Sequence, residues 1–419
     1  MYKYLIMFAL FTPLIGVWRV EQGAYAASVG IFGYQNGATL AFSSYLAVLI
    51  FVTFLSVNSY VARSSKMYYS PMVHNTTEEK HSYVHFSILL MMLNFGFLLI
   101  MLFVFDGAKV WFNNMDKGIF RASLGSFGAF PYMMTKFVIP ALFAYSTLQL
   151  VQIKRSSYFK YLWYVNAFLI IVVGSTWGFK TTGLFMMLPS LLILNWRMPV
   201  HKLITYFGSF FLFIMLFFTV FDAQSMEGID MIPFLFDRLT VLQGDVSWYI
   251  WGIFREGYTF PNYWPTLLAA MGDSALSTFV SNEDLIEWIS YHYDLTLTYL
   301  AVDSLHAIET GHSIVGTPFS EGIIAGGLFG MWLFAALAGI IIGRFFRLLD
   351  IAIRTGHPIF TALLSTYFCF HVFAWLTGGG ITQLFHFSIV INLLISYGLI
   401  MVMLPRRHSK VRLFSNSIS

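Results

Sequence analysis

Residues 203–221 read LITYFGSFFLFIMLFFTVF, an apolar run that contains no charged side chain. A helix of about 17 to 25 apolar residues crosses a bilayer core, so this run predicts a transmembrane helix. Comparable runs predict nine further spans, at 3–18, 38–60, 84–105, 129–151, 161–176, 181–196, 321–343, 358–376 and 381–404. The spans at 161–176 and 181–196 are short and joined only by WGFK, so they can also form one hairpin that does not fully cross. We expect an all-α polytopic membrane protein with about 10 transmembrane helices, in a range of roughly 9 to 12.

The composition of the whole chain agrees with that class. Hydrophobic residues make up 58% of the 419 residues, charged residues 11%, and the mean hydropathy is +0.71, values that do not suit a soluble globule. The net charge of +4 comes from basic residues scattered between apolar runs, not from a stripe that would bind nucleic acid. The single cysteine, Cys369, excludes an internal disulfide bond. We expect one membrane domain over 1–419.

The basic residues also predict the orientation of the chain. Most of the 24 Lys and Arg residues fall between spans that would face the cytoplasm if the N-terminus does, and cytoplasmic loops carry such an excess. Both termini are therefore expected in the cytoplasm. The first run is followed by Ala24, Tyr25 and Ala26, which resemble a signal-peptide cleavage site. The first helix can instead remain as an uncleaved anchor, and the intervening polar residues favour this alternative.

The orientation places the long segment 221–320 outside the cytoplasm. Four prolines interrupt it, whereas 266–280 and 284–300 have the length and mixed polarity of surface-lying or re-entrant helices. Its many tryptophans and tyrosines have two explanations, since aromatic rings favour the headgroup region of a bilayer and also pack against the CH groups of sugars. We expect recognition or chemistry in this large outer loop.

Four short motifs resemble the spaced signatures of Wzy-type polymerases, bacterial enzymes that join lipid-linked oligosaccharide repeat units into O-antigen or a related polysaccharide. They are GIFRASLGSFGAF (118–130), VGSTWGFKTTG (173–183), FDRLTVLQGD (236–245) and GHSIVGTPFSEGIIAGGLFG (311–330). The resemblance covers most of the chain in layout. It implies a GT-C-like membrane glycosyltransferase of the bacterial inner membrane, with 221–320 as a large periplasmic loop, that acts on sugars linked to undecaprenyl diphosphate.

Such a reaction requires cations near the leaving diphosphate. The basic residues outside or within the spans, near a span end or in the long loop, are Arg121, Lys136, Lys180, Arg238 and Arg255. Arginine suits bidentate contacts to phosphate, and an ionisable residue inside a span, such as Lys136, indicates a functional site. Each of these side chains can alternatively pair with a nearby carboxylate or reach toward lipid headgroups.

The reaction also requires a base for the attacking sugar hydroxyl. The candidate catalytic residues are His312, Glu321 and Asp245, and His306 is a further candidate in the same loop. The alternative role of Glu321 is electrostatic, because it opens the helix that follows Pro318 and would favour the positive N-terminal end of that helix, with Ser320 as the cap.

No Asp-x-Asp motif is present in the outer segments, so the sequence favours a mechanism without metal ions or other cofactors. The resemblance implies undecaprenyl-diphosphate-linked oligosaccharide as the substrate, with a chain-length regulator and a flippase as partners.

Two other roles remain open, since an O-antigen ligase has a similar layout and uses the same donor, and a transporter or flippase of lipid-linked oligosaccharide would also span the membrane many times. Repeated halves and polar groups near mid-membrane are typical of transporters. In this sequence the two halves differ, and the predicted spans are nearly free of ionisable groups. A scaffold role is a third alternative.

His371 and His386 are expected to form hydrogen bonds between helices, and the small residues Gly326, Gly330, Ala335, Gly339 and Gly343 are expected to allow close helix packing.

Overall fold

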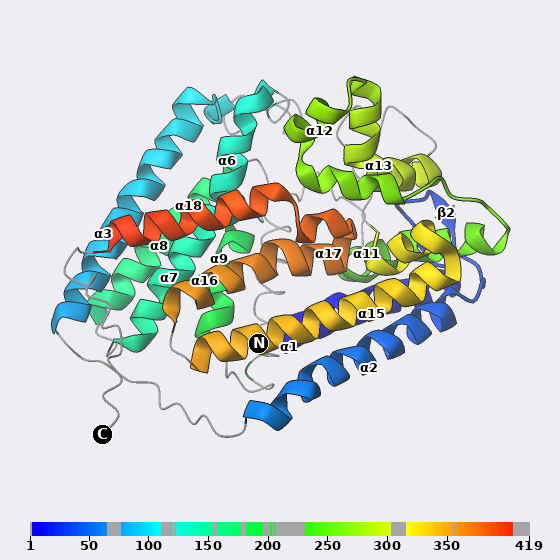
Figure 1. Ribbon diagram of the computed structural model, residues 1–419, viewed down its shortest axis with the longest axis horizontal. Helices are drawn as coiled ribbons and strands as arrows, with labels where there is room; N and C mark the ends of the chain where they lie inside the picture. The colour runs from blue at the N-terminus through cyan, green and yellow to red at the C-terminus, as the bar shows by residue number, and fades with distance from the viewer. Residues whose placement is uncertain are drawn as a thin grey trace. The chain divides into compact units, whose positions relative to one another are not determined.

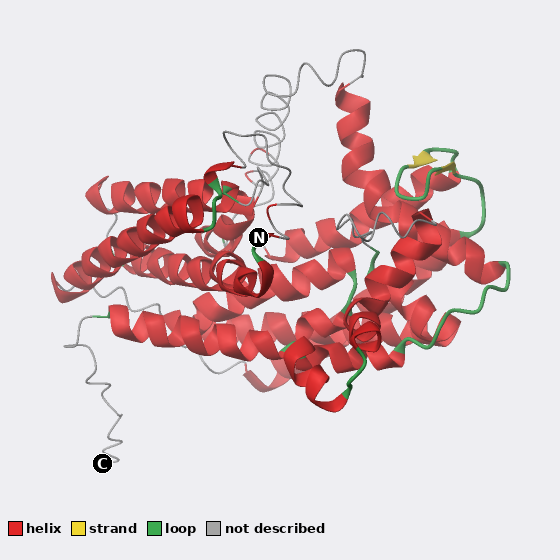
Figure 2. Ribbon diagram, turned by 90° about the horizontal axis from the view of Figure 1, so that it is seen from above, coloured by secondary structure: helices red, strands yellow, loops and turns green. Residues whose placement is uncertain are grey.

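The computed structural model describes residues 2–64, 77–109, 120, 123–153, 157–176, 182–195, 202, 205, 231–302, 316–354 and 357–404. In this part of the chain the fold is helical apart from one small two-stranded sheet (Figure 2). The contacts divide the chain into two compact units. Unit 1 comprises Met1–Met67, Asn195–Leu348 and His371–Ser388, and unit 2 comprises Tyr68–Leu194, Leu349–Phe370 and Ile389–Ser419.

Unit 1 holds the N-terminal helices and the segment predicted as the large outer loop (Figure 1). Its elements are α1 (Tyr2–Glu21), β1 (Tyr25–Ala26), β2 (Ile31–Phe32), α2 (Ala38–Ser64), α11 (Met231–Arg255), the 3-10 helix η5 (Trp264–Met271), α12 (Asp273–Phe279), α13 (Glu283–Val302), most of α15 (Pro318–Arg354), α17 (Phe373–Gly378) and the 3-10 helix η7 (Ile381–Leu384). The two strands pair antiparallel, Tyr25 opposite Phe32 and Ala26 opposite Ile31.

The contact between α1 and α11 depends on two glycines. A Cβ atom on Gly16 would lie 2.1 Å from the carbonyl oxygen of Thr240, and a Cβ atom on Gly244 would lie 2.3 Å from the amide nitrogen of Val17. Small residues at such a crossing let two helix backbones approach each other closely. The sequence of α1 is therefore matched to that of a helix more than two hundred residues away.

Helix α15 packs against α2 in the same way. A Cβ atom on Gly339 would lie 2.7 Å from the carbonyl oxygen of Leu49, and one on Gly343 would lie 2.5 Å from the Cβ atom of Ser56. These contacts confirm that Gly339 and Gly343 serve close helix packing. Gly326 has nothing within 4 Å of an added Cβ atom, so its expected packing role is wrong.

Unit 2 is built around a buried apolar core. Its helical elements are α3 (Thr77–Leu99), the π-helical turn η1 (Ile100–Val104), η2 (Gly125–Gly128), α6 (Ala129–Met133), the π-helical turn η3 (Met134–Val138), α7 (Ile139–Gln152), α8 (Ser157–Ser175), α9 (Thr182–Leu194), α16 (Pro358–Tyr367) and most of α18 (Phe387–Met403), and the π-helical turn η6 (Phe368–Val372) spans the boundary between the units.

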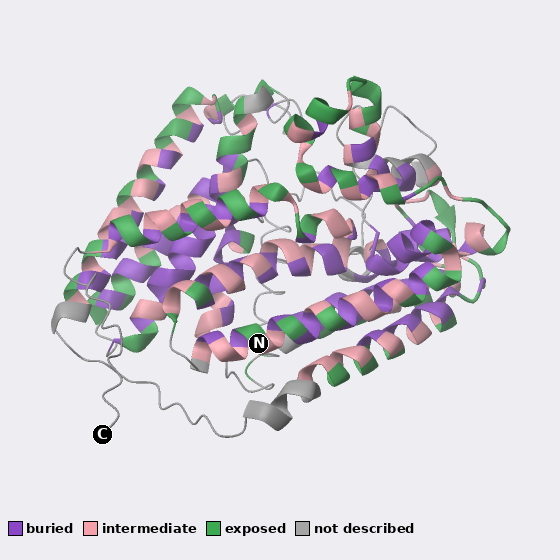
Figure 3. Cartoon of the chain, in the orientation of Figure 1, coloured by how far each residue is buried: buried purple, intermediate pink, exposed green. Residues whose placement is uncertain are grey.

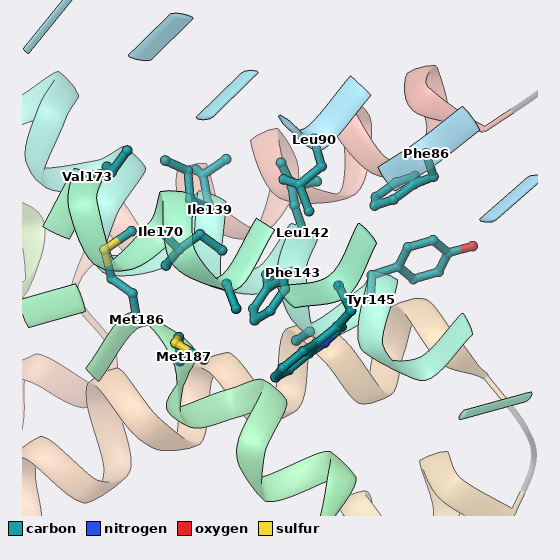
Figure 4. Close-up of a cluster of buried hydrophobic side chains, with 14 of the residues drawn as sticks. Phe86, Leu90, Ile139, Leu142, Phe143, Tyr145, Ile170, Val173, Met186 and Met187 are labelled. Carbon is teal, nitrogen blue, oxygen red and sulfur yellow. The ribbon is translucent and has the colours of Figure 1, made fainter. Parts of the chain in front are cut away.

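The core of unit 2 gathers around α7, most of whose residues are buried (Figure 3). Side chains from α3, α7, α8 and α9 meet in one cluster (Figure 4). Within it the Phe143 and Trp163 rings stack with centroids 5.2 Å apart, and the Trp163 indole N–H donates to Thr147 Oγ1 at 2.8 Å. The indole nitrogen therefore has a partner although it is surrounded by apolar side chains.

Seven helices in the described part of the chain are long and apolar enough to cross a membrane. They are Ala38–Val57, Lys80–Val104, Ala129–Gln152, Ser157–Ser175, Pro318–Ile353, Pro358–Gly378 and Ile381–Met403. Each corresponds to a predicted span, which confirms a helical protein suited to a membrane. The predicted span 203–221 lies outside the described residues except for position 205, and 3–18 forms α1, which is not among the seven. The count of about ten stays a prediction.

The predicted pair of spans 161–176 and 181–196 folds as α8 and α9. A Cβ atom on Gly174 would lie 2.3 Å from the Cα atom of Gly183, so the two helices approach each other closely near their connection. Helix α9 has 13 residues, a length of about 20 Å at 1.5 Å per residue. It is shorter than the roughly 30 Å core of a bilayer, as the hairpin alternative requires.

Candidate functional site in unit 1

Helix α15, the yellow ribbon in Figure 1, is broken near its N-terminal end. Gly326 has φ −176° and ψ 30°, and Gly327 has φ 60° and ψ −138°. The positive φ of Gly327 lies in a region that favours glycine. A Cβ atom on Gly330 would lie 2.0 Å from the carbonyl oxygen of Gly322, although residues eight apart in a straight helix are separated by about 12 Å. The arm 318–325 therefore folds back against the helix that follows.

The break shortens the continuous helical part of α15. Unbroken, the 36 residues of Pro318–Ile353 would extend about 54 Å, far more than the hydrocarbon thickness of roughly 30 Å. The sequence predicted one span over 321–343. Only the arm after Gly327 continues as a long helix, and the short arm carries Glu321.

Glu321 is fully buried, and its described contacts are with neutral donors. Its Oε1 atom accepts hydrogen bonds from the Tyr263 hydroxyl and from the backbone N–H of Ile381, the latter at 2.6 Å. Its Oε2 atom accepts the indole N–H of Trp375 at 2.9 Å. These donors come from three segments that are distant in sequence. The carboxylate joins the broken helix to η5, α17 and η7.

Two further tyrosines surround this network. The Tyr293 hydroxyl donates to the carbonyl oxygen of Thr317 at 3.2 Å, and a Cβ atom on Gly379 would lie 2.4 Å from that hydroxyl. Tyr45 is buried as well. Burial raises the pKa of Tyr263 well above its ordinary value, and the Glu321 carboxylate raises that pKa further. The phenol of Tyr263 therefore keeps its proton and acts as a donor.

A pocket of about 360 Å³ adjoins the broken helix. One wall is the backbone of the break, and the other is the segment that connects α11 to η5. Its lining residues are Phe254, Tyr258, Thr259, Phe260, Pro261, Asn262, Tyr263, Ile323, Ile324, Ala325, Gly326 and Gly327. No charged residue is present among the described lining residues, and Tyr263 belongs both to the pocket wall and to the Glu321 network. Backbone that leaves the helix at membrane depth is tolerated where it lines a cavity.

The N-terminal end of α15 is held by hydroxyl groups. Ser247 Oγ lies 2.9 Å from Thr317 Oγ1 and 2.9 Å from Ser320 Oγ, so α11 and α15 share a buried cluster. The expectation that Ser320 caps the helix is wrong. The helix begins at Pro318, and Ser320 lies inside its first turn and bonds with Ser247.

Asp245 is fully buried on α11, but its partners are structural. Its carboxylate accepts the backbone N–H of Ser28 at 2.9 Å and of Val246 at 2.8 Å. Ser28 lies in the turn between β1 and β2, so Asp245 fixes the small sheet to α11. Burial raises the pKa of Asp245, and the hydrogen bond from Ser28 counteracts this in part. Asp245 and Glu321 lie on neighbouring elements and have separate partners.

The candidate cations are distributed over unit 1, unit 2 and the residues that the structure does not describe. Arg255 is exposed at the end of α11, and its Nη1 atom donates to the carbonyl oxygen of Asn36 at 2.8 Å. Arg238 lies in α11, and nothing is described of its side chain. Lys136 belongs to unit 2, in the π-helical turn η3, with its Nζ atom 6.0 Å from the centre of the Tyr132 ring. Arg121, Lys180, His306 and His312 lie outside the described residues.

The sequence did not predict the contacts of several residues in unit 1. Tyr263 was visible only as one of many aromatic residues in the loop, and Trp375 only as part of an apolar span. Glu21 was visible as one polar residue after the first helix, yet its carboxylate accepts the backbone N–H groups of Gly37 and Ala38 at 2.6 and 2.8 Å and so caps α2. No local motif marks any of these contacts.

The helices within the segment predicted as the outer loop differ in part from expectation. The predicted helix 284–300 is confirmed as α13. The predicted helix 266–280 is divided into η5 and α12, because Gly272 between them has φ 80°. The predicted hydrogen bond of His371 is also present, with its Nδ1 atom 2.9 Å from the carbonyl oxygen of Gln383, whereas His386 bonds with its near neighbour Ser388.

Asp294 on α13 should make stability depend on pH. Burial raises the pKa of this carboxyl from 3.8 to about 6, so between pH 4 and pH 6 the folded protein binds the proton more tightly than the unfolded chain. Stability is therefore lost as the pH rises through this window. The full shift corresponds to about 3 kcal/mol, and because the side chain is partly exposed, we expect roughly 1 kcal/mol.

Asp294→Asn should consequently raise the melting temperature in detergent at pH 7.5 and leave it unchanged at pH 4. The matched control is Asp284→Asn, at an exposed position of the same helix. Equal effects of the two substitutions at pH 7.5 would contradict this expectation.

Comparisons of the chain with models of protein families, with curated proteins and with solved structures find no match.

Proposed function

We propose that this chain is a membrane glycosyltransferase, a polysaccharide polymerase. It transfers a growing glycan from undecaprenyl diphosphate onto the next lipid-linked repeat unit, on the outer face of the bacterial inner membrane. The observation that supports this most strongly is the uncharged pocket at the break of α15, whose wall includes the tyrosine that donates to the buried Glu321. A sugar pocket beside a proton acceptor is what glycosyl transfer to a hydroxyl group requires.

Glu321 is the base that this proposal favours. Asp245 is engaged by backbone groups of the β1–β2 turn, whereas Glu321 contacts a residue of the pocket wall. Charge on the leaving diphosphate requires cations, and in unit 1 the proposal assigns this role to Arg238 and Arg255. The resemblance of the four motifs to Wzy-type polymerases supplies the identity of the donor.

The experiment compares the lipopolysaccharide or capsule banding pattern of the host with and without this chain. Deletion should remove the long ladders and leave a band of core plus one repeat unit. Restoring the chain as Arg238→Ala should fail to recover the ladders at matched membrane abundance. Restoring it as Arg344→Ala should recover them, because Arg344 is an exposed residue on the predicted cytoplasmic side.

Two other banding patterns would contradict the polymerase function. Loss of every capped band after deletion would indicate an O-antigen ligase or a flippase. An unchanged pattern after deletion would contradict a role in glycan assembly.

A further inference from the structure

Glu321 is fully buried and is not among the residues that line the pocket. A base must lie within hydrogen-bonding reach of the proton that it removes, directly or through one intermediary. Tyr263 is the lining residue that bonds to Glu321. We propose that the pocket holds the sugar of the acceptor repeat unit, and that Tyr263 relays the proton of its attacking hydroxyl to Glu321. This inference rests on the proposed glycosyl transfer.

The lining of the pocket indicates a neutral, polar ligand. Diphosphate would meet no cation among the described residues of the wall, and burying an unpaired charge is costly. Tyr258 and Phe260 instead offer two rings with centroids 5.2 Å apart and an angle of 67° between their planes. The hydroxyl of Thr259 and the amide of Asn262 lie in the same wall. Rings combined with a few polar groups suit the alternating CH and OH groups of a sugar.

The broken helix adds backbone groups to this wall. A helix that ends leaves its last carbonyl groups without intrahelical partners, and the helix that follows leaves its first N–H groups free. Both kinds of terminus meet at Gly326 and Gly327, which line the pocket. Sugar hydroxyl groups can donate to the free carbonyl groups and accept from the free N–H groups. Gly327 also lets the pocket form, since a Cβ atom there would lie 3.1 Å from the Phe254 ring.

In this transfer each bond that forms is matched by a bond that breaks. The acceptor oxygen forms a bond to the anomeric carbon of the donor sugar, and the bond between that carbon and the diphosphate oxygen breaks. Undecaprenyl diphosphate leaves with the electron pair. The proton of the acceptor hydroxyl passes to the phenol oxygen of Tyr263 as the phenol's own proton passes to Glu321. A phenol oxygen has lone pairs to accept one hydrogen bond while it donates another, so Tyr263 ends the step neutral.

Tyr293 provides a matched comparison for Tyr263. Both are buried tyrosines of unit 1 close to Glu321, and both use the hydroxyl group as a donor. Tyr293 donates to the carbonyl oxygen of Thr317 and does not line the pocket. The same change from Tyr to Phe therefore removes a relay at one position and an ordinary hydrogen bond at the other.

The first experiment measures polymerisation by the full-length protein in proteoliposomes. The substrate is lipid-linked repeat unit extracted from a strain that lacks this chain. Tyr263→Phe should lower kcat on the order of 100-fold with little change in KM, because general base catalysis contributes about 10²- to 10⁴-fold. Tyr293→Phe should stay within about threefold of the wild type. Tyr263→Phe combined with Glu321→Gln should be about as slow as either single variant, since residues of one relay are not additive.

Equal rates for Tyr263→Phe and Tyr293→Phe would overturn the relay, as would a double variant whose loss is the product of the single losses. The melting temperatures of the two tyrosine variants should be equal, so that a difference in their rates reflects catalysis and not loss of folded protein. If the wild-type protein forms no polymer from this substrate, the proposed function itself fails.

The second experiment addresses the pocket. Tyr258→Ala should raise KM for the repeat unit about tenfold, which is equivalent to about 1.4 kcal/mol, because the substitution removes an aromatic contact. Tyr258→Phe should restore the wild-type KM, because the ring is retained. An unchanged KM in Tyr258→Ala would show that the acceptor sugar binds elsewhere.

Discussion

Gly330→Val is expected to prevent this protein from accumulating in a folded form. A Cβ atom at this position would lie 2.0 Å from the carbonyl oxygen of Gly322 and 3.1 Å from its carbonyl carbon. Both atoms are backbone, so they cannot move aside as a flexible side chain would. The two arms of α15 would have to separate, and closely packed interiors do not absorb such a displacement. We expect a loss of about 4 kcal/mol or more, in the range of the most severe single substitutions.

The measurement is the yield of monodisperse protein in detergent, followed by its thermal unfolding. Gly326→Ala is the matched control four residues earlier, since a Cβ atom there has nothing within 4 Å and the φ of −176° lies outside the left-handed region. The Gly326→Ala variant should retain most of the wild-type yield. Normal yield and stability of Gly330→Val would mean that the short arm does not fold back on the helix.

Glu321→Ala should be the second most damaging change, lowering the free energy of unfolding by about 3 kcal/mol or more. The substitution leaves the Tyr263 hydroxyl, the Trp375 indole N–H and the Ile381 N–H without their acceptor. Each buried donor left unsatisfied costs about 1 to 3 kcal/mol. Water that enters the space could satisfy some of the donors, which is why the expected loss lies at the lower end of the sum.

The test is thermal unfolding of the full-length variant in detergent. Glu287→Ala on α13 is the control, because Glu287 is exposed and surface substitutions change stability by about 0.5 kcal/mol or less. Glu321→Gln should lie between the two, since its amide oxygen keeps one acceptor while its NH₂ group faces a donor. If Glu321→Ala were as stable as Glu287→Ala, the hydrogen bonds to the buried Glu321 carboxylate would be contradicted. The position of Glu321 as the candidate base would then be contradicted too.

The sequence by itself determined the class of this protein. Apolar runs long enough to cross a bilayer can be found from composition alone, because each one satisfies its backbone hydrogen bonds within a single helix. The helices Ala38–Val57, Lys80–Val104 and Pro358–Gly378 follow the predicted spans closely for this reason. Local chemistry also identified α13, and it placed Glu321 in the first turn of its helix.

Tertiary structure decided the break in α15 and the partners of Glu321. The run GIIAGGLFGMW is compatible with a straight apolar helix, and its glycines become a turn only because Gly322 and Gly330 can then pack backbone against backbone. The donors to Glu321 lie at positions 263, 375 and 381. No local pattern connects residues so far apart in sequence. Helix formation depends on neighbouring residues and can be predicted from them, whereas a buried polar network depends on where distant segments meet.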